Sequence, residues 1–398
     1  MNPRENPYTP NAGARPPALV GRDAELEGFE ILLERLGRGY AEQSMLITGL
    51  RGVGKTVLLG AFESRARDAG WVTVSGEITK NEIFGPRMGS MVRRALFQVA
   101  PKASWTEKIR RAAGVLKSFS ITVASDGSVS AGIDIDPVEG MADSGNLSDD
   151  LTDLLVALGE AAQERGTGIA FLLDEVQFLR AVEFEALIAG LHRTVQRQLP
   201  ITLVGAGLPQ LPRLAGEAKS YAERLFKFPL IGKLSPPEAE AALAEPAADL
   251  GVTFEEGAID VIVEYTEGYP YFIQEYGKIV WDVAPEGRSI SRSVAEEAQR
   301  AVEAKLDESF FRVRAQRTTE LELQYLRAMA ELGPDEHSAG DVAAVMSRTS
   351  EQLGPTRARL IDKGLIYTTG HGRGDFTVPQ FDRYMRRNYE LNPPPPRR

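Results

Sequence analysis

The sequence has no cysteine and only three histidines, His192, His337 and His371, among its 398 residues. The absence of cysteine excludes disulfide bonds, thiol nucleophiles and thiolate metal clusters. Histidines so far apart in the sequence do not indicate a metal site, and no Ser-His-Asp arrangement of a hydrolase is evident. The function must therefore depend on other side chains.

Long apolar runs are missing as well. No window approaches the ~20 apolar residues that a membrane span requires. The first seventeen residues, MNPRENPYTPNAGARPP, also lack the apolar centre of a secretory signal. We therefore predict a cytoplasmic protein that does not enter a membrane.

An excess of positive charge is missing too, because 46 Lys and Arg stand against 56 Asp and Glu, which gives a formal net charge of −10. This balance excludes a chain that coats nucleic acid with its whole surface. Any nucleic-acid site must be local.

Short apolar runs, such as SMLITG and GIAFLLDE, alternate with amphipathic stretches over the first half of the chain. This alternation predicts an α/β fold, with a parallel sheet flanked by helices. In KSFSITVASDGSVSAGIDIDP, apolar and polar residues alternate on both sides of SDGS, which is a hairpin signal. The predicted organisation is a disordered or extended arm (1–17), an α/β core (18–233) with a helix-and-hairpin insertion (101–146), a helical lid (234–311), a winged helix (312–390) and a disordered Pro-rich tail (391–398).

The stretch LITGLRGVGKT fits the pattern G-x-x-x-x-G-K-[ST], with a predicted strand before it and a helix after it. Glycines allow successive backbone N–H groups to close on phosphate oxygens, and the helix adds its positive end. Lys55 is predicted to reach the β- and γ-phosphates, and Thr56 to ligate Mg²⁺. The alternative is a Gly-rich turn that binds nothing. The predicted ATP-binding residues of this loop are Gly49, Arg51, Gly52, Val53, Gly54, Lys55, Thr56 and Val57.

The stretch IAFLLDEVQFL predicts a buried strand that ends in Asp174 and Glu175 at the carboxyl edge of the sheet, where ligands bind. Asp174 is predicted to hold Mg²⁺, and Glu175 to activate water as a general base. An acidic pair at a solvated strand end is the alternative.

These motifs, together with ALVGRDAELEGF and YTEGYPYFIQEYG, resemble those of the AAA+ and STAND ATPases, including the origin-recognition-like group and the archaeal and bacterial ATPases allied to it. The resemblance covers residues 18–390. It implies that Val20, Gly21 and Arg22 lie beside the nucleotide base and that Pro270 brings the lid against it. It also implies that Arg224 is an arginine finger for a neighbouring subunit, and therefore a homo-oligomer or nucleotide-dependent self-association. Arg22 as a helix cap and Arg224 as a surface residue are the alternatives.

Two positions depart from the family pattern. The stretch ITLVGAG has glycine and alanine at 205–207, where many relatives have a polar residue that orients water, and only Gln210 is nearby. Tyr271 stands where many relatives have a sensing arginine. We therefore expect a slow ATPase that acts as a switch.

In a winged helix that binds DNA, the third helix enters the major groove and the wing contacts the backbone or minor groove. Residues 312–398 contain 14 Arg and Lys against 11 Asp and Glu, in a chain that is acidic as a whole. This asymmetry favours double-stranded DNA as a partner. A STAND-type regulator whose winged helix binds a protein is the main alternative, and a metabolic kinase is a weaker one. The predicted DNA contacts are Gln352, Thr356, Arg357, Arg359, Lys363, His371 and Arg373.

Overall fold

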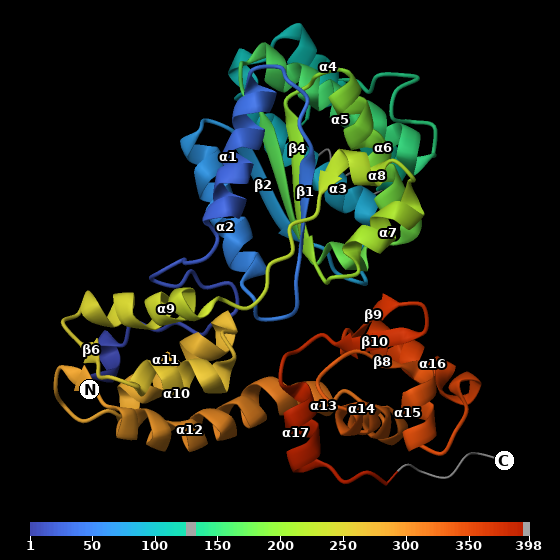
Figure 1. Ribbon diagram of the computed structural model, residues 1–398. Helices are drawn as coiled ribbons and strands as arrows, with labels where there is room; N and C mark the ends of the chain where they lie inside the picture. The colour runs from blue at the N-terminus through green and yellow to red at the C-terminus, as the bar shows by residue number, and fades with distance from the viewer. Residues whose placement is uncertain (125–132, 393–398) are drawn as a thin grey trace.

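Five parallel strands form the central sheet of the computed structural model, in the order β2-β3-β4-β1-β5 (Figure 1). The structure describes residues 1–124 and 133–392. Because all five strands run the same way, their carboxyl ends share one edge of the sheet, and the loop after β1 lies there. The strands are β1 (Ser44–Thr48), β2 (Val72–Glu77), β3 (Ile169–Asp174), β4 (Ile201–Gly207) and β5 (Phe226–Lys227).

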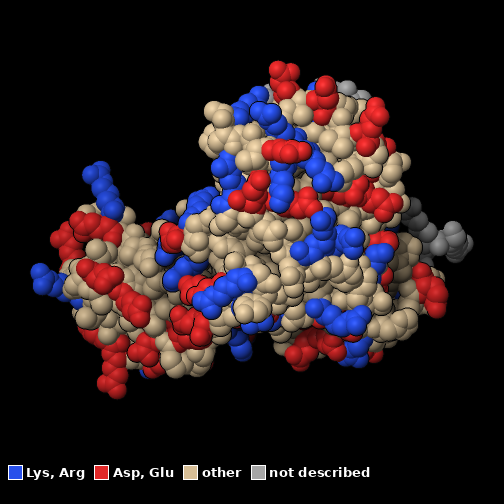
Figure 2. Space-filling view, turned by 90° about the horizontal axis from the view of Figure 1, so that it is seen from above, with Lys and Arg blue, Asp and Glu red and all other residues tan. Residues whose placement is uncertain are grey.

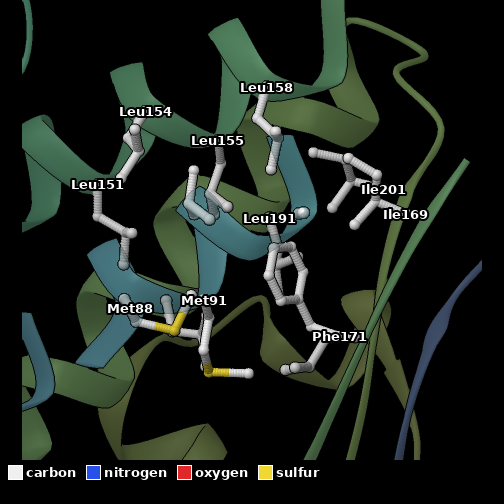
Figure 3. Close-up of a cluster of buried hydrophobic side chains, with 14 of the residues drawn as sticks. Met88, Met91, Leu151, Leu154, Leu155, Leu158, Ile169, Phe171, Leu191 and Ile201 are labelled. Atoms are coloured by element: carbon white, nitrogen blue, oxygen red, sulfur yellow. The ribbon is translucent and has the colours of Figure 1, made fainter. Parts of the chain in front are cut away.

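Helices cover both faces of this sheet, as predicted (Figure 1). On one face, Phe29 and Phe62 stack with ring centroids 4.4 Å apart. On the other, leucines at helical spacing on α5 gather with Phe171 of β3 (Figure 3). The central strands are therefore apolar on both sides, typical of parallel sheets. The helices are α1 (Asp23–Gly37), α2 (Lys55–Asp68), α3 (Phe84–Val99), α4 (Glu107–Val123), α5 (Leu147–Glu164), α6 (Ala181–Gln196), α7 (Leu211–Ala218) and α8 (Ala222–Leu225).

The insertion differs from its prediction. Residues 117–123, expected as the first strand of a hairpin, are the last turns of α4. Ile109, Leu116 and Phe119 lie at helical spacing and are fully buried, with α4 packed against α3 and α5. Burial of this face determines the helix, and the alternation of apolar and polar residues was misleading. The predicted SDGS turn lies outside the described residues.

The lid is helical, as expected, and adds one short parallel strand pair, β6 with β7. Helix α12 continues through the π-helical segment η4 into α13, so one unbroken helical run leads from the lid into the C-terminal domain. The lid elements are α9 (Pro236–Ala248), β6 (Thr253–Phe254), α10 (Ala258–Thr266), α11 (Pro270–Val283), β7 (Ser289–Ile290), α12 (Arg292–Leu306) and η4 (Asp307–Phe311), followed by α13 (Arg312–Ala315).

The C-terminal domain contains three helices followed by two strands around a Gly-rich turn. Strand β8 extends these strands into an antiparallel sheet of order β8-β10-β9, and α17 follows it. This sheet lies on the side of the domain that faces the core (Figure 1). The elements are α14 (Glu320–Leu332), β8 (His337–Ser338), α15 (Ala339–Val345), α16 (Ser350–Asp362), β9 (Ile366–Gly370), β10 (Arg373–Phe376) and α17 (Phe381–Asn388). Over the described ranges, none of the helices is both long and apolar enough to cross a membrane.

The N-terminal arm (residues 1–17) packs against the lid, so its predicted disorder is wrong and the extended alternative is the better description. Tyr8 is buried to 2% exposure, and its hydroxyl donates to the Leu243 carbonyl at 2.6 Å. The Thr9 N–H donates to the Gln274 side-chain oxygen at 3.1 Å. One buried aromatic therefore orders a segment that has the composition of a disordered chain.

Candidate functional site

A cleft of about 470 Å³ lies where the core, the arm, the lid and the C-terminal domain meet. This volume is within the range of pockets that hold small ligands. The core contributes the loop 51–57 and the acidic end of β3. The lid contributes Pro270 and Tyr271, and the helical run into the C-terminal domain contributes Phe310 and Arg314.

The loop between β1 and α2 has the backbone that the motif requires. Gly52 and Gly54 have φ values of +84° and +94°, a conformation that L side chains rarely adopt. The Lys55 ammonium donates to the carbonyls of Gly49 at 2.8 Å and Leu50 at 2.7 Å. Burial lowers the pKa of Lys55 to about 8, against the opposing influence of the two carboxylates nearby. A buried cation and a helix N-terminus thus converge on one anion site.

Asp174 and Thr56 meet across the sheet although they lie 118 positions apart in the sequence. The Thr56 hydroxyl donates to Asp174 Oδ2 at 2.5 Å, and the Glu175 N–H donates to Asp174 Oδ1 at 2.8 Å. A hydroxyl and a carboxylate oxygen are ligands that Mg²⁺ accepts. The residues predicted to hold the metal therefore fit that ion.

Glu175 lies between two polar side chains. Its carboxylate is 3.4 Å from the Arg51 guanidinium and accepts from the Gln177 amide. The Gln177 oxygen accepts from the Leu208 N–H at 3.2 Å, so Gln177 joins Glu175 to the end of β4. A Cβ at Gly207 would overlap the Gln177 side chain, which explains the glycine there.

Gln177 was not predicted from the sequence, because the polar residue was sought on β4 itself. Gln210, the residue identified nearby, is not among those that line the cleft. The signal that could have found Gln177 is its position two residues after Glu175, at the end of the adjacent strand.

The leading segment is only partly placed as predicted. Val20 and Arg22 line the cleft, but Gly21 does not. The Arg22 guanidinium donates to the carbonyls of Gly21, Val53 and Gly232 at 2.8, 3.2 and 2.8 Å, and burial lowers its pKa. Arg22 thus joins the leading segment to the loop and to the start of the lid, and its side chain makes no helix-capping bond.

Two predicted glycines, Gly21 and Gly49, do not line the cleft. Close neighbours explain why glycine is found at each position. A Cβ on Gly21 would approach the Glu238 carboxylate to 2.6 Å. A Cβ on Gly49 would approach the Ile231 carbonyl oxygen to 2.5 Å. Both positions allow close packing of neighbouring chain segments, which is a second reason for glycine there.

The lid and the C-terminal domain both hydrogen-bond to the loop. The Tyr271 N–H donates to the Gly52 carbonyl at 3.1 Å, and the Arg51 N–H donates to the Thr377 carbonyl at 2.9 Å. Lys80 of the core also forms an ion pair with Asp362 of α16 at 2.6 Å. The contact between the C-terminal domain and the loop was not predicted from the sequence.

Arg224 lies far from the loop of its own chain. It is an exposed residue on α8, just before β5, and Phe226 of β5 pairs with Ser44, the first residue of β1. Arg224 is therefore at the amino edge of the sheet, opposite the loop. From there it can serve only the site of another copy, so its finger role stays a prediction.

The predicted DNA contacts are not one free surface. Thr356 is 1% exposed, and its hydroxyl accepts from Arg359 at 3.2 Å, so the prediction that Thr356 contacts DNA is wrong. Arg359 and Lys363 form ion pairs with the buried Glu322 at 3.0 and 2.5 Å. Burial alone would raise the pKa of Glu322, but hydrogen bonds from Lys363, the Thr319 N–H and Arg359 lower it to about 2.

The remaining predicted contacts are more accessible. Gln352 and His371 are exposed, and Arg373 pairs with Glu336 at 2.7 Å. Arg357 is partly buried and donates to the Arg373 carbonyl at 2.6 Å. Basic and acidic side chains are interspersed over the face of the molecule in Figure 2. A local basic surface would therefore consist of few residues.

Comparison with known proteins supports the interpretation of the core. Residues 18–204 match the family described as AAA ATPase domain, and residues 308–385 match a domain of unknown function (DUF8462). No curated protein matches the sequence.

Solved structures match nearly the whole chain. The Walker-type ATPase paby2304 of Pyrococcus abyssi has 15% identity and a TM-score of 0.56, over 94% of this chain and 97% of that chain. The Holliday junction branch migration motor RuvB of Thermotoga maritima has 17% identity and a TM-score of 0.44, over 96% and 100%. Aeropyrum pernix ORC1, solved in complex with DNA, has 16% identity and a TM-score of 0.45, over 94% of each chain.

Proposed function

We infer that this chain, an AAA+ P-loop ATPase by its residues 18–204, is a nucleotide-dependent switch. In this proposal, ATP in the cleft sets the position of the lid and the C-terminal domain relative to the core. The observation that carries it is the pair of backbone hydrogen bonds by which Gly52 and Arg51 of the loop contact Tyr271 and Thr377. A ligand that moves this loop must act on both domains.

The core residues account for hydrolysis. Lys55 and the loop N–H groups would bind the phosphates, and Thr56 with Asp174 would hold Mg²⁺, which supplies positive charge to the β- and γ-phosphates. Glu175, oriented by Gln177, would take a proton from water as the water oxygen bonds to the γ-phosphorus. The bond to the bridging oxygen then breaks, and ADP and phosphate leave. Because β4 offers no polar side chain at 205–207, we propose slow turnover.

A distance measurement tests the switch. Since the chain has no cysteine, Arg110→Cys on α4 and Ala358→Cys on α16, both exposed positions, allow two spin labels to be attached selectively. We expect the distance distribution between the labels to differ between ATP and ADP, and the difference to disappear with Lys55→Ala. One distribution in all nucleotide states contradicts the proposal.

We also propose that the C-terminal domain is a winged helix. Double-stranded DNA is the first candidate for its partner. The net positive charge of residues 312–398, with Gln352, Arg357, His371 and Arg373 at accessible or partly accessible positions, supports it. Duplex affinity should fall as salt rises and weaken with Arg373→Ala, because phosphate contacts release counterions. No binding at low salt in any nucleotide state contradicts a role in DNA binding.

A STAND-type regulator that binds protein is the second candidate. Its specific support is Glu322, which offsets the charges of Arg359 and Lys363, and the contact of the C-terminal domain with the phosphate loop. Under this hypothesis the domain alternates between the loop and a protein partner. Absence of duplex binding, together with a nucleotide-dependent change in label distance, favours it.

A further inference from the structure

Arg314 is a cation without an acidic partner in the cleft. It lies on α13, at the start of the C-terminal domain, and lines the same cleft as Arg51 and Lys55. No ion pair joins it to a carboxylate in residues 1–124 and 133–392, and the charged groups that act on it most are Arg51, Tyr271 and Arg317. Burial, with a smaller contribution from Arg51, lowers the pKa of Arg314 to about 10. A cation in this environment is destabilised until an anion lies beside it.

Ring contacts hold the Arg314 guanidinium near the loop. It lies 4.1 Å from the centroid of the Phe310 ring and donates to the Phe310 carbonyl. Phe310 stacks on Tyr271 with centroids 4.7 Å apart, and Tyr271 is hydrogen-bonded to Gly52. This chain of contacts fixes Arg314 relative to the loop that would hold the phosphates.

The neighbours of Arg314 indicate which part of a nucleotide it would contact. Arg51, the cation that most affects its pKa, is the residue that contacts Glu175 at 3.4 Å. Glu175 marks the reacting end of the cleft in the proposed mechanism.

We propose that Arg314 binds the γ-phosphate of ATP from within the same chain and thereby makes the C-terminal domain sensitive to the difference between ATP and ADP. This inference rests on the proposed ATP-dependent switch and adds a residue to it. Because α12, η4 and α13 form one unbroken helical run, movement of Arg314 would be transmitted both to the start of the C-terminal domain and to the lid. The π-helical segment Asp307–Phe311 directly before it is a form often found at functional sites.

Nucleotide selectivity tests the proposal. In Arg314→Met, which keeps an unbranched apolar side chain, we expect affinity for ATP to fall about tenfold or more while affinity for ADP changes by less than about threefold. Arg314→Lys should restore part of the selectivity. The matched control is Arg312→Met. Arg312 is exposed on the same helix and pairs with Glu308 at 3.3 Å, so this variant should bind both nucleotides as wild type does. Titration calorimetry with each nucleotide measures both affinities.

The outcomes separate the two proposals. If wild type binds ATP and Lys55→Ala does not, but Arg314→Met keeps the wild-type ratio of ATP to ADP affinity, the role of Arg314 is wrong and the switch stands. Equal loss of ATP and ADP affinity in Arg314→Met also overturns it, because Arg314 would then maintain only the shape of the cleft. Absence of nucleotide binding in wild type overturns both. If Arg314→Met does not fold, Arg314→Gln provides the same comparison.

Discussion

Basic side chains have different partners in two regions of this molecule. In the cleft, Lys55 donates to loop carbonyls and Arg314 donates to a carbonyl and lies over a ring, and neither forms an ion pair within residues 1–124 and 133–392. At the C-terminal end of α16, Arg359 and the capping residue Lys363 both contact the buried carboxylate of Glu322. A buried cation that forms no ion pair within the protein is stabilised by a bound anion, whereas a cation paired with a buried carboxylate contributes to folding. The partner, more than the number of basic residues, therefore indicates where an anionic ligand binds.

Lys55→Ala should have the largest effect. We expect loss of measurable ATP binding, because the variant removes the buried ammonium that lies at the phosphate site. Calorimetric titration with ATP is the measurement, and Lys108→Ala, at an exposed position on α4, is the matched control. If Lys55→Ala and Lys108→Ala bind ATP equally well, a cation in the cleft contributes no more to ATP binding than a basic residue elsewhere.

Glu175→Gln should leave ATP binding intact and lower turnover about 10²–10⁴-fold, because an amide cannot accept the proton of the attacking water. Phosphate release under single-turnover conditions measures this rate. Glu185→Gln is a control, since Glu185 pairs with Lys219 away from the cleft. Normal turnover in Glu175→Gln means that another group is the base.

Lys363→Ala should lower the free energy of unfolding by about 2 kcal/mol, because it leaves Glu322 buried with fewer donors. Arg357→Ala on α16 should lower it by less than about 1 kcal/mol, since the Arg357 guanidinium donates to a backbone carbonyl and not to a buried carboxylate. Urea denaturation followed by circular dichroism compares them. Equal stability of the two variants would show that pairing with Glu322 does not matter for folding.

The pH dependence of ATP affinity should be the smallest effect. The pKa of Lys55 is about 8 in the folded protein, below its ordinary value, so the ammonium is mostly charged at pH 7 and about tenfold less populated at pH 9. Because a bound phosphate favours the charged form, ATP affinity should fall by up to about tenfold between pH 7 and 9, with proton uptake on binding. Lys55→Arg should remove this dependence if it still binds ATP. If the ATP affinity of wild type does not change with pH over this range, Lys55 is not a titrating group that binds the phosphates.

The sequence predicted the loop and the acidic strand well for a physical reason. Contact with a phosphate demands glycine, lysine and threonine at fixed spacing, and a buried parallel strand is apolar until its last residues. Gln177 and Arg314 have no such local signature. Their positions depend on space that Gly207 leaves open and on a helix that begins in the lid.

Thr356 illustrates an avoidable error on α16. Its helix was interpreted from its charges, although Leu353, Thr356 and Leu360 lie at spacings of three and four and share the buried face. The arm could not be predicted in the same way. Tyr8 finds its partners more than 200 positions away, where no sequence window includes both.

The packing of the arm also affects the order in which the molecule is completed during synthesis. The arm is translated before the sheet domain, but Leu243 and Gln274, to which it bonds, are added only after the whole sheet domain has been translated. At about 5–20 residues per second, the arm would wait on the order of 10–50 s for them. Tyr8 is exposed during that interval, so a chaperone or a neighbouring chain can reach it. Because arm residues line the cleft, the cleft reaches its final form only after the lid has been made.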